Sequence, residues 1–215
     1  MSPFAKLLAI PVLFFSVAAI AQETSQHVTF VTHAAFFSKE THQPKSLDPQ
    51  VFVRDPTAPA AVGPQGIEHV AGVRSVLIDS DAKSTLVMNA KDEPLGFNLG
   101  QWLGAKGSAT ITPVADRKAK ITASFSGLRP DGHYSLFENH FDQKPIGFTP
   151  LDGTGERNNF IADKSGRAKI TVTAPSMLTK VNAILLVYHS DGKDHGTERG
   201  PIGITAHHQL IAPIE

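Results

Sequence analysis

The feature that most constrains the fold is a series of short segments after residue 107 in which apolar and polar residues alternate. Ile121, Ala123 and Phe125 alternate with polar neighbours in residues 120–126, which predicts a strand with one buried and one wet face. The other predicted strands of this half are 108–112, 134–140, 159–162, 168–173, 184–188 and 209–211. Many short strands with little helix predict an all-β fold, a Greek-key β-sandwich or barrel.

The chain before residue 107 is less regular. Residues 27–37 read as one strand, and five prolines then fall between positions 44 and 64. Because proline lacks a backbone donor and fixes φ, we predict an ordered arm or long loop over 38–68, with an edge strand at 51–53.

Two further strands, at 70–78 and 85–88, and one helix are expected before residue 107. Leu95, Leu99 and Trp102 have the spacing of one helix face, which predicts a short helix over 94–105. We therefore divide the chain into an N-terminal extension, 22–106, and a β-sandwich core, 107–215.

The first residues have the pattern of an export signal. Lys6 precedes an apolar run at 7–20, and Ala19 and Ala21 supply small residues at a cleavage position. This pattern predicts a signal peptide, 1–21, that is cleaved after Ala21. The run is shorter than the ~20 residues that cross a bilayer as a helix. The mature protein is expected to be periplasmic or secreted, without a membrane span.

Composition excludes several functions. The chain of 215 residues has no cysteine, which excludes disulfides, thiol catalysis and Cys-ligated zinc. Its 20 Lys and Arg balance 20 Asp and Glu, so there is no basic surplus of the kind that binds nucleic acid.

Histidines supply the candidate chemistry. The densest segment, at 189–195, reads His-Ser-Asp-Gly-Lys-Asp-His after an apolar run. In an extended chain His189 and Asp191 point to the same side. Imidazole and carboxylate suit zinc or copper, so we consider His189, Asp191 and His195 as metal ligands. The alternative is a solvated turn in which these side chains have no ligand.

Glu138 and His140 form a second pair with the same spacing. If their strand neighbours the strand that ends at His189, the three side chains could share one metal site. The alternative is that Glu138 and His140 belong to the wet face of an edge strand.

Three motifs in order along the chain resemble the copper–zinc superoxide dismutases. They are Gly127-Leu-Arg-Pro-Asp-Gly-His133, Asn159-Phe-Ile-Ala-Asp-Lys-Ser-Gly-Arg-Ala168 and Leu185-Leu-Val-Tyr-His189. The resemblance covers roughly residues 107–205 and implies a superoxide-dismutase-like β-sandwich. It also implies that His189 is a metal-binding histidine and that Arg199 echoes the active-site arginine. The chain is similar as well to uncharacterised secreted bacterial proteins with a Tyr-His-Ser-Asp-Gly segment.

The chain departs from that family where the metals would bind. The family's copper-binding H-x-H pair corresponds here to Leu136-Phe-Glu138, and residues 148–158 contain no histidine. A lone imidazole does not make a copper redox site. We therefore expect an exported, non-enzymatic binding protein, with one copper or zinc ion at His189 and the neighbouring candidates. The alternatives are a copper-dependent redox enzyme and a structural module of the cell envelope whose 38–68 arm binds a protein partner.

Overall fold

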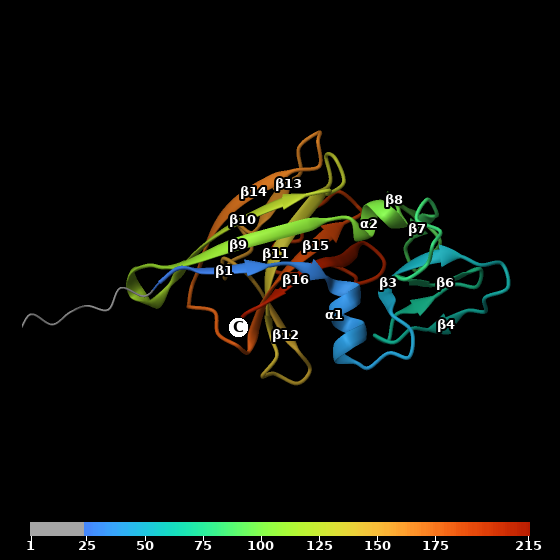
Figure 1. Ribbon diagram of the computed structural model, residues 1–215, viewed down its shortest axis with the longest axis horizontal. Coiled ribbons are helices and arrows are strands. Elements are labelled where there is room, and N and C mark those ends of the chain that lie inside the picture. The colour runs from blue at the N-terminus through green and yellow to red at the C-terminus, as the bar shows by residue number, and fades with distance from the viewer. Residues whose placement is uncertain (1–23) are drawn as a thin grey trace, which may run out of the picture.

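The computed structural model describes residues 24–215, which form a β-sandwich with a smaller β lobe at one end (Figure 1). The predicted signal peptide, 1–21, lies outside the described residues. The all-β sandwich fold is confirmed, since several antiparallel sheets dominate the chain. In residues 24–215 no helix is long and apolar enough to cross a membrane.

The first sheet of the sandwich has four antiparallel strands. Their order is β1 (Gln26–Thr29), β9 (Lys106–Pro113), β10 (Ala119–Ser126) and β14 (Ala168–Ala174). In β10, Ile121, Ala123 and Phe125 are buried, whereas the residues between them are partly or fully exposed. The alternation seen in the sequence thus gives this sheet its core face and its wet face.

The second sheet carries the candidate residues on its long central strands. Its order is β12 (Gly147–Pro150), β11 (His133–His140), β15 (Asn182–His189), β16 (Ala206–Pro213) and β2 (Val31–Thr32), and β13 (Asn159–Ile161) also pairs with β11. Its inner face, with Leu136 and Leu186, belongs to the main core. Its outer face, with Phe137 and Val187, packs against Phe36. Both faces are therefore covered, which explains the nearly continuous apolar sequence of β15.

The proline-rich segment contains a central strand, which corrects the prediction of a loop with an edge strand. The lobe sheet has the order β6 (Val73–Leu77), β3 (Leu47–Arg54), β7 (Leu86–Met88) and β8 (Pro94–Asn98), beside the small pair β4 (Ala61–Val62) and β5 (Glu68–His69). The pairing of β3 with β6 is interrupted between Leu47 and Phe52. Pro49 lies in this interruption, where its missing N–H is not needed.

The helices also differ from the sequence-based expectation. Residues 27–37 are not one strand, because helix α1 (His33–Glu40) begins there with Thr32 as its N-cap. The predicted helix over 94–105 is a strand, β8, followed by the short helix α2 (Leu99–Leu103). Asn98 caps α2 in a capping box with Gln101, which sets its first residue. A single 3₁₀ turn, Ala115–Arg117, joins β9 to β10.

The extension and the sandwich share one hydrophobic core. β1 and β2, from the extension, pair with β9 and β16 respectively. Val51 and Phe97 of the lobe belong to the same buried cluster as Ile121 and Leu186 of the sandwich. The boundary predicted at 106/107 falls after the first residue of β9, and the hydrophobic core extends across it.

Candidate functional site

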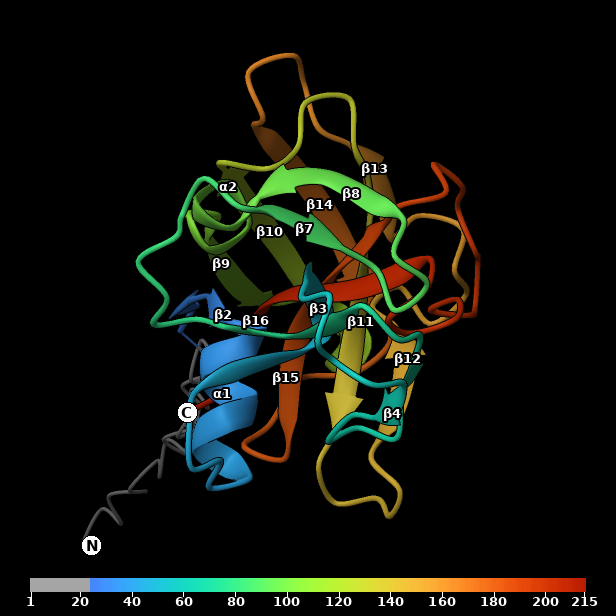
Figure 2. The same ribbon diagram turned by 90° about the vertical axis from the view of Figure 1, so that its right-hand side faces the viewer.

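The register of β11 and β15 separates two groups of predicted ligands. The strands are neighbours, as Figure 2 shows, and they run antiparallel, with His133 opposite His189 and His140 opposite Asn182. At a rise of about 3.3 Å per residue, His140 lies roughly 23 Å along the sheet from His189.

The two groups also lie on opposite faces of the sheet. Glu138 has the parity of Leu136 and points inward, whereas His189 has the parity of Val187 and points outward. Glu138, His140 and His189 therefore do not form one site, although their strands do pair.

Glu138 and His140 make a local pair at the far end of β11. Glu138 Oε1 lies 3.7 Å from His140 Nδ1, and His140 Nε2 lies 2.9 Å from Thr149 Oγ1. Burial raises the pKa of Glu138, and the facing His140 opposes that shift. The buried carboxyl group of Glu138 thus contacts the imidazole of His140, and Thr149 provides a hydrogen-bond partner for that imidazole.

His189, Asp191 and His195 do come together, at the other end of the sheet. The rings of His189 and His195 are 5.0 Å apart, and His195 Nε2 lies 3.1 Å from Asp191 Oδ2. Two residues that the sequence did not single out as ligands join them, because His133 lies opposite His189 and its Nδ1 lies 3.6 Å from Asp194 Oδ1. We call these five residues the β15 histidine cluster.

Two ring nitrogens of the β15 histidine cluster lack a hydrogen bond. His189 is 1% exposed, its Nε2 lies 2.6 Å from Ser135 Oγ, and its buried Nδ1 has no partner. The buried Nδ1 of His133 likewise has none. Burial, reinforced by the nearby His195, lowers the pKa of His189 to about 4. His189 is therefore neutral at pH 7, the form in which imidazole binds a metal ion.

Arg199 belongs to a different group of side chains. Its guanidinium lies 3.3 Å over the ring of Phe148, and its Nη1 lies 3.1 Å from His208 Nε2. Burial lowers the pKa of Arg199 to about 10. Arg199, which the resemblance compares with an active-site arginine, thus packs against the buried His208.

His208 is part of a buried polar network that the sequence analysis missed. Its Nδ1 lies 2.9 Å from Gln50 Nε2 and 3.4 Å from His33 Nε2. Beside it, His207 Nδ1 lies 3.2 Å from the carbonyl oxygen of Gln50. The network connects α1, β3 and β16, which are distant in sequence. The one local signal of this network in the sequence is the adjacency of His207 and His208, because Gln50 and His33 belong to no local motif.

Two activities do not fit the side chains of the β15 histidine cluster. On the outer face β11 and β15 supply two imidazoles, His133 and the opposite His189, and the next outward positions of β11 are Ser135 and Phe137, so a copper site built from three or more imidazoles of these paired strands does not fit. A serine hydrolase does not fit either, because Ser135 is 1% exposed and His189 Nδ1 has no carboxylate partner. In residues 24–215 no three His, Asp or Glu side chains already converge as metal ligands.

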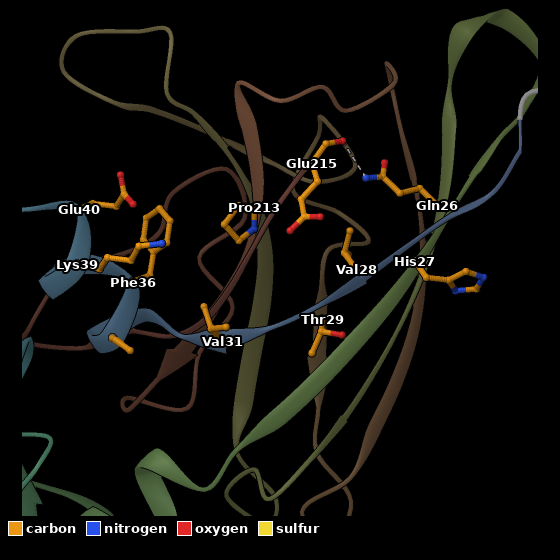
Figure 3. A pocket seen from close by; sticks show the side chains of 11 residues that line it. Gln26, His27, Val28, Thr29, Val31, Phe36, Lys39, Glu40, Pro213 and Glu215 are labelled. Carbon is orange, nitrogen blue, oxygen red and sulfur yellow. Dashed lines mark hydrogen bonds between the residues drawn. The ribbon is translucent and has the colours of Figure 1, made fainter.

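A separate hollow lies away from this cluster. It has a volume of about 650 Å³ and is bordered by β1, α1 and the C-terminus. Val28, Phe36 and Pro213 line it together with charged residues, and Figure 3 shows Lys39, Glu40 and Glu215 around it. None of the residues of the β15 histidine cluster borders it.

No protein-family model matches the chain, and no curated protein matches it.

Proposed function

We propose that the protein is an exported, non-enzymatic binding protein that holds one divalent transition-metal ion in the β15 histidine cluster. The observation that carries this proposal is the buried, unpartnered Nδ1 of His189 beside His133 and His195. Neutral imidazoles and carboxylates suit Zn²⁺ and Cu²⁺.

The loop after β15 supplies the adjustable ligands. His195 would leave its contact with Asp191, so that His195 and one carboxylate turn toward His189. Gly192 and Gly196, both with positive φ, flank the segment that carries Asp194 and His195. His189 and His133 stay on paired strands and form the rigid half of the site.

The signal peptide predicted at residues 1–21 supports an extracytoplasmic location for this function, since such a segment directs the mature chain out of the cytoplasm. The partner-binding alternative has less support, because Val51 and Phe52 in the 38–68 segment are fully buried. The copper redox alternative has less support, because β11 places only one further imidazole, that of His133, on the outer face beside His189. The relationship to the copper–zinc superoxide dismutases stays a prediction.

The test is calorimetric titration of the mature protein, 22–215, with Zn²⁺ and separately with Cu²⁺ at pH 7.5. We expect binding of one ion, and a loss of affinity of at least tenfold in His195→Ala, whose side chain lies in a loop. His140→Ala is the matched control, because it removes a histidine from the far end of β11 and should leave the affinity unchanged. Absence of binding, or equal affinity in the two variants, would refute the proposal.

A further inference from the structure

A second hollow lies where the lobe meets the turn between β10 and β11. It has a volume of about 280 Å³, and no residue of the β15 histidine cluster lines it. Glycines of β8, α2 and the turn form part of its wall, together with Phe97, Leu128 and Pro130. Among the described residues that line it, only Arg129 is charged. The hollow therefore combines a mostly apolar wall with a single guanidinium.

Groups outside the hollow hold this guanidinium in place. Nη1 of Arg129 donates to the carbonyl oxygen of Leu95, at 3.4 Å, and to the hydroxyl oxygen of Tyr188. That hydroxyl donates in turn to the same carbonyl oxygen, at 3.1 Å. Burial raises the pKa of Tyr188, so the hydroxyl keeps its proton at neutral pH. Because the side chain is already anchored, it loses little conformational freedom when a ligand binds.

The other edge of the guanidinium has no partner in the protein. In the part of the chain that the structure describes, Nε and Nη2 of Arg129 make no hydrogen bond, and Arg129 forms no ion pair. Neither atom is among the buried polar atoms that lack a partner, so both are open to solvent. A Cβ at Gly96 would lie 2.9 Å from each of them. Since Gly96 and Arg129 both line the hollow, the free edge lies at its wall.

We propose that this hollow binds the carboxylate group of a small organic acid with an apolar body. The N–H groups of Nε and Nη2 match the two oxygens of a carboxylate, the bidentate geometry for which arginine is suited. One guanidinium balances the single charge of a carboxylate, whereas a phosphate group would bring further negative charge. Phe97, Leu128 and Pro130 offer apolar surface to the rest of the ligand. The proposal does not depend on the metal site.

The test is titration of the metal-free mature protein with benzoate at pH 7.5 and constant ionic strength, followed by ¹H–¹⁵N correlation spectra. We expect saturable shifts of the Gly96 and Gly127 amides and of Arg129 Nε–H, with one dissociation constant of about 1 mM or lower. Benzamide, which has the same ring without the charge, should bind at least tenfold more weakly. Absence of saturation below about 20 mM benzoate would overturn the proposal. Equal affinity for benzamide, or tighter binding of inorganic phosphate, would also overturn it.

A substitution at the rim of the hollow tests the same site without removing the arginine. Gln101 lines the hollow, and its side chain accepts the N–H of Asn98 in the capping box of α2. Gln101→Glu keeps such an acceptor but adds a negative charge near the guanidinium, so the affinity for benzoate should fall at least tenfold. Arg129→Lys, which keeps the charge and loses the paired N–H groups, should cause a similar loss. Arg157→Lys, at an exposed position, is the matched control and should leave the affinity unchanged. Wild-type affinity in Gln101→Glu or in Arg129→Lys would refute the site.

Discussion

Acid should destabilise this protein well above the pH at which most carboxylates titrate, because four histidines are buried in neutral form. Burial lowers the pKa of His33 to about 3 and those of His189 and His207 to about 4. It also holds the pKa of His208 well below the ordinary value, with help from His33 and Arg199. The unfolded chain binds protons at these positions first, so acid favours unfolding. Their contribution to stability is complete above about pH 7 and is lost as the pH falls below about 6.5.

The expected loss can be worked out for pH 5. Keeping one histidine neutral at pH 5 costs about 2 kcal/mol relative to an unfolded chain in which it titrates near 6.5. His33, His189 and His207 together cost about 6 kcal/mol, and His208 acts in the same direction. Asp48 has the opposite effect, because burial raises its pKa to about 6. Its protonation in the folded state at pH 5 raises the free energy of unfolding by about 1.5 kcal/mol. The net loss of about 5 kcal/mol is a large share of the 5–15 kcal/mol typical of a domain.

Urea denaturation of the metal-free protein at pH 7.5 and pH 5, followed by the fluorescence of Trp102, measures this loss. His33→Gln should reduce the difference in unfolding free energy between the two pH values by about 2 kcal/mol, whatever its effect at pH 7.5. His27→Gln, at an exposed position on β1, should leave the difference unchanged. A difference below about 1 kcal/mol in the wild type would refute the reasoning, because it would mean that the buried histidines are protonated in the folded state.

Three other predictions concern the parts that hold the sandwich, the lobe and the loops together. At Gly155 φ is 78°, and Gly155→Ala would place a Cβ 2.3 Å from the carbonyl carbon of Gly196. Thermal denaturation should therefore show a free energy of unfolding that is lower by at least about 2 kcal/mol. In Gly66→Ala nothing lies within 4 Å of the new Cβ, so this control should lose only about 1–2 kcal/mol from its positive φ. Trp102→Phe removes the Nε1 donor that lies 2.9 Å from Asp48 Oδ2. Urea denaturation should show a free energy of unfolding that is lower by about 2 kcal/mol at pH 7.5. The decrease should be smaller at pH 5, where Asp48 is protonated. Asp152→Ala removes an acceptor of four backbone N–H groups between Thr154 and Arg157, so amide exchange of these groups should accelerate at least tenfold.

The strands of the sandwich could be predicted because their signal is local. In β10 the alternation of Ile121, Ala123 and Phe125 matches the buried face, and period 2 needs no knowledge of neighbouring strands. The helix predicted over 94–105 is present only as α2, and the error at residues 94–98 also comes from a local signal. Leu95 and Leu99 have helical spacing, but Leu95 and Phe97 also alternate with Gly96, as apolar residues do in a strand. Pairing of β8 with β7 decides between the two periods, and a pairing partner is not visible locally.

The lobe shows a second limit of local patterns. Proline predicted a loop around residue 49, because an isolated strand there would lack a donor. In the structure the strands beside β3 do not require that donor, and Val51 and Phe52 are buried in the centre of a sheet. The buried network of His33, Gln50 and His208 lies beyond sequence analysis for a similar reason, since its three residues come from separate elements.

The candidate site depends on the parity of strand positions, which the sequence alone left open. His189, Asp191 and His195 lie within one short segment, so their proximity could be expected from chain length. Whether β11 adds ligands depends on which of its residues share the outer face with His189. A shift of one residue would turn Glu138 outward in place of Phe137, because side chains alternate between faces. The observed register places His133 directly opposite His189, with Ser135 next to it on the same face. β11 therefore contributes one imidazole to the outer face beside His189, whereas Glu138 stays on the inner face with Leu136.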